Sequence, residues 1–152
     1  MKFKHIIVLA LCSFWFISCE KGSDFSGTEA EQIRQYIASK NLKVDDSTST
    51  GFKLIYTKRN PSGSLPKSRQ SVNLDYSGTL LSGKKFDSGN FSFRLGIDGV
   101  VEGFKLGVER VRVGEKATLI FPSSLGYGSS GTSGIPGNSP LVFDIEVLSV
   151  SN

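Results

Sequence analysis

Five short β-like segments, separated by glycine and proline, constrain the fold of this chain more than any other feature of its sequence. Apolar residues occupy every second position in 72–76 and again in 143–147. A period of two is typical of strands with one face on a core and the other face in water. The five segments are 52–57, 71–81, 91–95, 115–122 and 141–150. We therefore expect an antiparallel sheet within residues 51–152.

One segment between the predicted strands has a different period. Val100, Phe104, Val108 and Val111 recur at helical spacing, which predicts one short helix that faces the sheet. The glycines 103 and 107 would weaken this helix in isolation, but they would also let it lie close against the strands. The predicted fold class is therefore α+β.

A second, amphipathic helix is predicted upstream, over residues 28–42. Thr28 and Glu31 have the spacing of a capping box, and Ile33, Tyr36 and Ile37 share one face. The polar run 44–51 has no periodicity and predicts a linker or loop, with a domain boundary near residue 50. This helix could pack on its own domain, exchange between protomers or act as a spacer, and its short apolar face favours a monomer.

The first 19 residues resemble the leader of a bacterial lipoprotein. Lys2 and Lys4 precede an apolar stretch over 6–17, and small Ser18 precedes Cys19. This stretch is shorter than the roughly 20 residues that span a bilayer. We predict a signal peptide over 1–18, then a lipidated Cys19 with a polar tether and the short helix over 19–50. The protein would be anchored to a bacterial membrane and face the periplasm or the exterior; the alternative is an ordinary cleaved leader.

The distribution of rare residues excludes several kinds of chemistry. Both cysteines and the single histidine lie within the first 19 residues. A chain that begins at Cys19 therefore lacks the base of a Ser-His-Asp or Cys-His system, the ligands of a zinc site and an internal disulfide. Removing Lys2 and Lys4 from the 18 basic residues leaves a near balance with the 14 acidic ones. We predict no metal, no cofactor and no nucleic-acid partner.

Seven sequence blocks in a fixed order make residues 51–148 similar to the FKBP-type peptidyl-prolyl isomerases. The blocks are 75–80, 83–88, 91–96, 100–107, 113–116, 122–128, and 135–136 together with 141–144. Each block alone is weak, and the ordered set carries the resemblance. It implies a curved antiparallel sheet, a half-barrel wrapped around one short helix, which agrees with the periodicities above. It also implies isomerase activity on proline-containing polypeptides during protein folding, and macrolide inhibitors as ligands.

The resemblance further implies an aromatic pocket between the helix and the sheet. Carried over position by position, the catalytic residues would be Tyr76, Asp87, Phe104, Tyr127 and Phe143. The substrate-binding residues would be Phe86, Phe91, Val100, Val101 and Ile135. Phe104 would form the floor, and the Val101 N–H and the Tyr127 hydroxyl would donate hydrogen bonds to substrate carbonyls. Asp87 would supply a buried polar side chain.

Two positions depart from the pattern of the resembled family. Phe104 stands where many members have tryptophan, and the predicted loop 88–90 is short and contains no arginine that could pair with Asp87. We therefore expect Asp87 to depend on Tyr76 and on backbone donors. Phe93 and Phe121 are expected in the core. The other functions considered are a non-catalytic peptide-binding or chaperone module on the same fold and a structural envelope lipoprotein.

Overall fold

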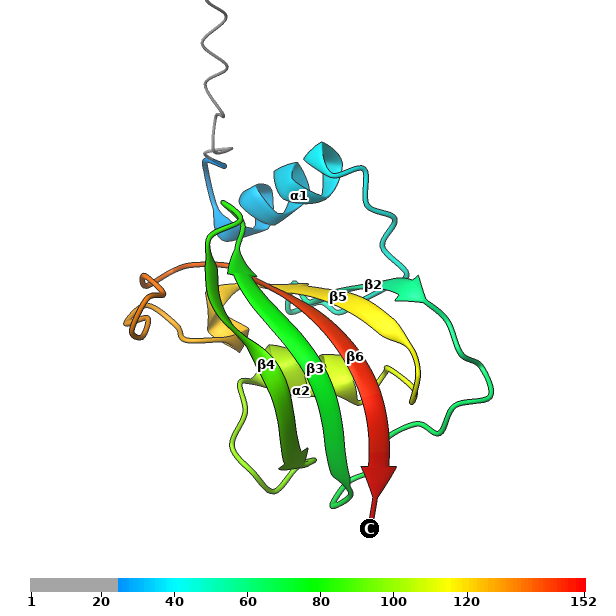
Figure 1. The fold of residues 1–152 in the computed structure, drawn as a ribbon. Helices are drawn as coiled ribbons and strands as arrows, with labels where there is room; N and C mark the ends of the chain where they lie inside the picture. Colours follow the sequence, from blue (N-terminus) through cyan, green and yellow to red (C-terminus); the bar gives the residue numbers. More distant parts are fainter. Residues whose placement is uncertain (1–24) are drawn as a thin grey trace, which may run out of the picture.

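The computed structural model describes residues 25–152 as a curved, six-stranded antiparallel sheet with two α-helices (Figure 1). The strand order is β1-β2-β5-β6-β3-β4. The strands are β1 Asp46–Ser47, β2 Lys53–Lys58, β3 Ser71–Leu80, β4 Lys85–Arg94, β5 Lys116–Phe121 and β6 Leu141–Ser151. The helices are α1 Glu29–Ser39, α2 Glu102–Val108 and the 3-10 turn η1 Ser123–Leu125. The α+β prediction of a curved sheet around a short helix is confirmed, whereas the predicted signal peptide and Cys19 lie outside the described residues.

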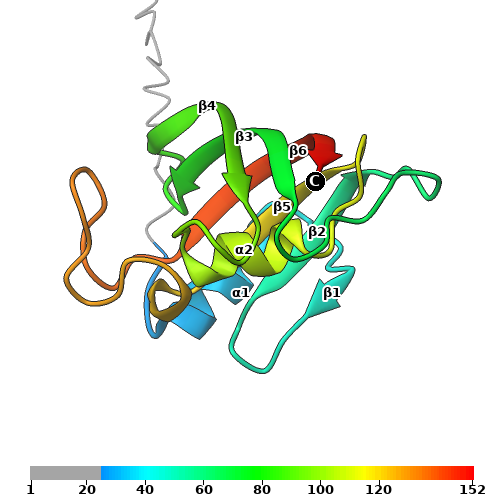
Figure 2. The same ribbon diagram turned by 90° about the horizontal axis from the view of Figure 1, so that it is seen from below.

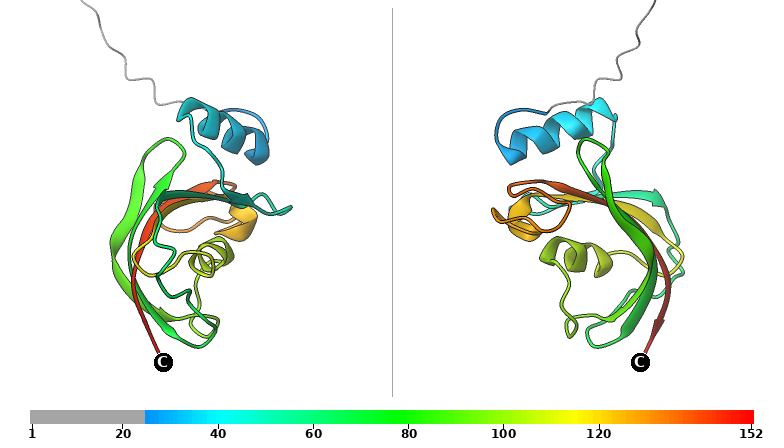
Figure 3. Two further views of the ribbon diagram at one scale, coloured as in Figure 1. Left: turned by 90° about the vertical axis from the view of Figure 1, so that its right-hand side faces the viewer. Right: turned by 60° about the vertical axis from the view of Figure 1, so that its left-hand side comes forward.

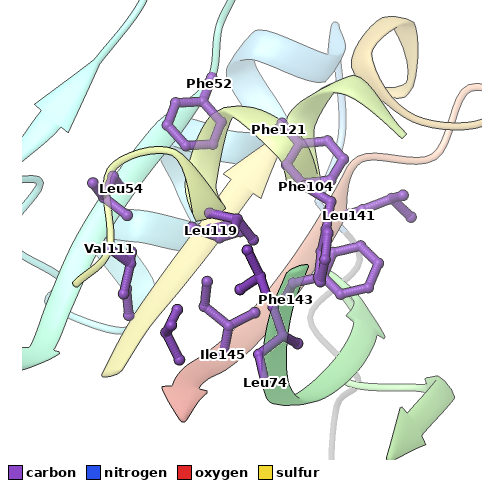
Figure 4. Packing of buried hydrophobic residues seen from close by; sticks show 14 of the residues in the cluster. Phe52, Leu54, Leu74, Phe104, Val111, Leu119, Phe121, Leu141, Phe143 and Ile145 are labelled. Carbon is purple, nitrogen blue, oxygen red and sulfur yellow. The ribbon is translucent and has the colours of Figure 1, made fainter. Parts of the chain in front are cut away.

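The main core lies between α2 and the concave face of the sheet (Figures 2 and 4). Strand β5 places Leu119 and Phe121 on this face, and Ile120 on the opposite one. Strand β6 adds Phe143 and Ile145, and Phe104 reaches this core from α2. The period of two in β3 and β6 therefore corresponds to one core face and one more exposed face, as predicted, whereas β5 is buried on both faces of the sheet.

Helix α2 lies close against β5 because two of its contact positions are glycine. A Cβ atom on Gly103 would overlap with the Phe121 ring, and one on Gly107 would overlap with the Leu119 side chain. Both of these neighbours are fully buried and have no space to move. The predicted close approach of this helix to the strands is confirmed.

Gly107→Ala is expected to lower the free energy of unfolding by about 1–3 kcal/mol, because the added methyl group overpacks a filled core. In an exposed helix the same change would instead stabilise by about 1 kcal/mol. Gly89→Ala is the control, since a Cβ there meets nothing within 4 Å. Urea denaturation that gives equal stabilities for Gly107→Ala and the parent would contradict the close-approach argument.

Helix α1 packs on the other face of the sheet from α2 (Figure 3). The predicted capping box is present: Thr28 Oγ1 accepts from the Glu31 N–H at 3.3 Å, and Glu31 Oε2 accepts from the Thr28 N–H at 2.8 Å. Ile33 is buried against Ile55, Ile120 and Val142. Of the arrangements considered for this helix, the structure shows packing on its own sheet. Neither α1 nor any other helix within 25–152 has the length and apolarity needed to cross a membrane.

Two segments differ from the sequence-based expectation. The run 44–51, expected as a linker or loop, contains β1, which pairs with β2 before the chain turns through 48–51. The prediction of a loop at 88–90 is wrong, because β4 is one continuous strand that pairs with β3 from Arg94 to Lys85. Strand β4 is the edge of the sheet and is mostly exposed, so small polar residues that favour turns elsewhere are tolerated in it.

Candidate active site

An open cavity of about 440 Å³ lies between α2 and the β3–β4 part of the sheet. It is lined by Tyr76, Phe86, Asp87, Phe91, Gly99, Val100, Val101, Phe104, Tyr127 and Phe143. The structure therefore brings together every residue predicted for the aromatic pocket except Ile135. Gly99 is the one lining residue that the sequence did not suggest, since it contributes backbone and no side chain.

Phe104 and Phe143 form a rigid apolar floor in this cavity. Each is 5% exposed, and their rings meet edge to face with centroids 5.2 Å apart. Tyr76 adds a second edge-to-face contact with Phe104, at 6.2 Å. Figure 4 shows Phe104 and Phe143 among the packed core side chains. Such aromatic contacts fix the floor and leave one apolar surface facing the opening.

Two core phenylalanines support the floor from behind. Phe121 stacks on Phe143 with the ring centroids 5.8 Å apart, and the ring centroids of Phe93 and Phe104 are 6.1 Å apart. Both are buried and neither lines the cavity, as expected from the sequence.

Two residues that line the cavity, Tyr127 and Val101, each have a hydrogen-bond donor without a partner among residues 25–152. Tyr127 is 37% exposed, and Val101 precedes α2 as its N-cap residue. Within residues 25–152, neither the Tyr127 hydroxyl nor the Val101 N–H makes a hydrogen bond. Phe91, at 38% exposure, adds an apolar wall beside them. The cavity can therefore hold an apolar ring over Phe104, with two hydrogen-bond donors among the residues that line it.

Asp87 lies on the edge strand at the cavity mouth and is exposed, so its expected burial is wrong. The Tyr76 hydroxyl donates to Asp87 Oδ2 at 2.7 Å, and the Ser88 N–H donates to Oδ1 at 2.8 Å. These are the two kinds of partner expected in the absence of an arginine. The hydrogen bond to Asp87, helped by partial burial and the nearby carboxylate charge, raises the pKa of Tyr76 to about 12.

Asp87→Asn is expected to bring the pKa of Tyr76 from about 12 back toward its ordinary value of 10.0, because the charged acceptor is lost. The raised pKa means that the folded state retains the phenol proton longer than the unfolded state. The hydrogen bond thus contributes stability fully below pH 10.0 and loses that contribution as the pH rises through about 12. An NMR titration of the tyrosine ring carbons measures this, and ionisation of Tyr76 near pH 10 in the parent would contradict it.

Ile135 does not lie at the cavity. It is buried in the main core, and it exchanges backbone hydrogen bonds with Thr132, each of 2.9 Å. This bridge turns the loop back on itself and places the isoleucine over apolar neighbours. The family pattern matched the position of Ile135 in the sequence, but it did not predict how this loop folds.

Comparisons with known proteins agree with this fold. Residues 63–148 match the model of the FKBP-type peptidyl-prolyl cis-trans isomerases. The chain is 35% identical over 136 residues to the FKBP-type peptidyl-prolyl cis-trans isomerase FkpA of Escherichia coli, which covers 86% of this chain and 48% of FkpA. It is 42% identical over 93 residues to FK506-binding protein 1 of Saccharomyces cerevisiae, covering 57% of this chain and 82% of that protein.

The crystal structure of FkpA from Escherichia coli superposes with a TM-score of 0.68 at 38% identity, and covers 80% of this chain and 57% of that one. The chain thus belongs to the FKBP-type peptidyl-prolyl cis-trans isomerase family, and the resemblance in its sequence is confirmed. It spans about half the length of FkpA.

Proposed function

We propose that this protein isomerises Xaa-Pro peptide bonds in polypeptides that fold at the cell envelope, and that the cavity over Phe104 is its active site. The observation that carries the proposal is the apolar floor together with two lining residues, Val101 and Tyr127, whose N–H and hydroxyl have no hydrogen-bond partner among residues 25–152. Membership of the isomerase family supports the same reaction. The substrate is a proline-containing chain, and no cofactor takes part in the reaction.

The cavity would act by binding the twisted imide better than the planar one. Rotation about the Xaa-Pro bond has a barrier of about 18–20 kcal/mol, because the C–N bond loses its partial double-bond character. The twisted carbonyl is less polar, so a site that removes water from the imide raises the planar ground state relative to it. The prolyl ring would rest on Phe104 between Phe91 and Phe143, while the two donors hold neighbouring carbonyls. Catalysis is then differential binding and requires no proton transfer.

A refolding assay tests this function. The substrate is a protein whose slow refolding phase is limited by prolyl isomerisation, which takes tens to hundreds of seconds without a catalyst. We expect a faster slow phase with the parent and a smaller acceleration with Tyr127→Phe, which removes one donor and retains the ring. Suppressed aggregation without faster refolding would instead favour a peptide-holding module.

A proline-mimicking macrolide is proposed to occupy the same cavity and to compete with the substrate. A relative of this chain, FK506-binding protein 1 of Saccharomyces cerevisiae, is named for binding FK506, a macrolide of this kind. FK506 should therefore inhibit the acceleration of refolding in proportion to its occupancy of the cavity.

We propose that the domain is anchored to a membrane through lipid on Cys19. The support is the sequence: the apolar leader after Lys2 and Lys4, the Ser18-Cys19 pair, and the polar stretch 20–24 that leads to α1. The proposed organisation is a signal peptide over 1–18, a lipidated tether with helix α1 over 19–50 and the isomerase domain over 51–152, acting as a monomer. Several acyl chains, each contributing about 0.8 kcal/mol per buried CH₂, would hold it at the surface.

Cys19→Ser is expected to move the protein from the membrane fraction to the soluble fraction of the cell envelope, since no acyl chain can then be attached. Intact mass measurement of the parent should show the added lipid on the residue-19 N-terminus. An unmodified parent that fractionates as the variant does would contradict the anchor.

A further inference from the structure

The first residue of α1 binds the turn that leads to the cavity. Glu29 Oε2 accepts from the Ser123 N–H at 2.6 Å, and Glu29 Oε1 accepts from the Ser123 hydroxyl at 2.7 Å. Ser123 is buried and lies 94 residues away along the chain. One carboxylate therefore satisfies both polar hydrogens of a buried residue, and hydrogen bonds to an ionised acceptor are among the stronger ones in proteins.

Ser123 in turn fixes the backbone on both sides of Tyr127. Its carbonyl accepts from the Gly126 N–H and from the Gly128 N–H, each at 2.8 Å. Tyr127 lies between these two donors, and its side chain lines the cavity mouth. Glu29 does not line the cavity, so any effect on the site must pass through Ser123 and the backbone of this turn.

We infer that Glu29 is a positioning residue of the isomerase site, which sets the place of the Tyr127 hydroxyl by holding Ser123 at the start of η1. The inference rests on the proposed function, in which that hydroxyl binds a substrate carbonyl. Without Glu29, the Ser123 N–H and hydroxyl would be buried without a partner, which a structure avoids by shifting or opening the segment. Helix α1 is then part of the catalytic domain as well as the segment that follows the tether.

The position of Tyr127 can be measured independently of activity. The chain has four tyrosines, so 3-fluorotyrosine labelling of the full-length protein in detergent gives four ¹⁹F signals, and Tyr127→Phe assigns the one of interest. Glu29→Ala should shift or broaden the Tyr127 signal and leave that of Tyr56, whose hydroxyl donates to the Arg110 carbonyl, in place. The matched control is Glu31→Ala, which breaks the capping box of the same helix without touching Ser123.

A double-mutant cycle tests whether this position matters to the reaction. Glu29→Ala should lower kcat/KM roughly tenfold, since a small misplacement of a substrate-binding group is costly. In the Tyr127→Phe background the same change should have no further effect, because the affected hydroxyl is already absent. Glu29→Gln, which retains one acceptor, should recover part of the loss. If Glu29 had only a structural role, Glu29→Ala would lower the stability in both the parent and the Tyr127→Phe background. Its effect on kcat/KM would then be the same in the two backgrounds.

Separate outcomes decide the inference and the proposed function. An unchanged Tyr127 signal in Glu29→Ala, or kinetic losses that multiply independently of Tyr127, would overturn the inference. If the parent shows no isomerisation, the ¹⁹F shift alone decides whether Glu29 positions Tyr127. If Glu29→Ala does not fold, Ser123→Ala replaces it, since it removes one of the two hydrogen bonds and should shift the same signal by a smaller amount.

Discussion

Phe104→Ala is expected to lower kcat/KM for Xaa-Pro isomerisation roughly 30-fold, because the prolyl ring loses the apolar surface beneath it. Burial of a side chain of this kind contributes about 2 kcal/mol, which corresponds to that factor in rate. The variant should also lose about 3–5 kcal/mol of stability, since Phe104 is a buried core residue. Kinetics are therefore compared at a temperature at which circular dichroism shows the variant to be folded.

Phe52→Ala separates the loss of the floor from the loss of stability. Phe52 is fully buried in the same core as Phe104, but it does not line the cavity. We expect a comparable loss of stability and a kcat/KM close to that of the parent while the protein is folded. Equal kinetic losses in the two variants would show that Phe104 acts through the fold alone.

Glu115→Ala is expected to destabilise the fold by about 3 kcal/mol, through the loss of a buried acceptor. The Glu115 side chain is 1% exposed and accepts from the Asn60 N–H at 3.0 Å and from the Arg112 N–H at 2.9 Å. Arg59 Nε lies 3.0 Å from Glu115 Oε1 and forms an ion pair with this carboxylate. Removal of Glu115 leaves two backbone donors without a partner where the loop before β3 meets the start of β5.

Arg59→Ala removes the other partner of the same ion pair and should cost only about 1 kcal/mol or less. The Arg59 side chain is 55% exposed, and its guanidinium lies over the Tyr56 ring at 3.7 Å. Because the side chain is largely exposed, water can replace most of the interactions that are lost when Arg59 is removed. Chemical denaturation of both variants tests the contrast, and similar losses for Glu115→Ala and Arg59→Ala would contradict it.

The features that the sequence predicted well depend on local patterns. The spacing of Thr28 and Glu31 predicted a helix start, and Gly103 and Gly107 predicted the close approach of α2 to the sheet. The ordered blocks predicted nine of the ten cavity-lining positions, because family blocks preserve the order of strands and helix. These predictions needed no knowledge of which distant segments meet.

The features that the sequence missed depend on neighbours far along the chain. Glu115 lies in a matched block, but its role depends on Asn60, which lies 55 residues earlier, in the loop between β2 and β3. The contact between Glu29 and Ser123 has no local signal either. The predicted strand 91–95 is shorter than β4, because Ser88, Gly89 and Asn90 favour turns. Only their pairing with β3 makes these residues part of a strand. The same pairing places Asp87 on an exposed edge.

The central claim, that this cavity isomerises Xaa-Pro bonds, is tested most directly by two-dimensional exchange NMR on short proline peptides. The method observes cis–trans exchange itself and needs no coupled protease. We predict that the parent accelerates exchange, that Phe104→Ala, Asp87→Ala and Tyr127→Phe reduce the acceleration, and that Phe52→Ala retains it. A folded parent that leaves the exchange rate of every peptide unchanged would contradict the claim.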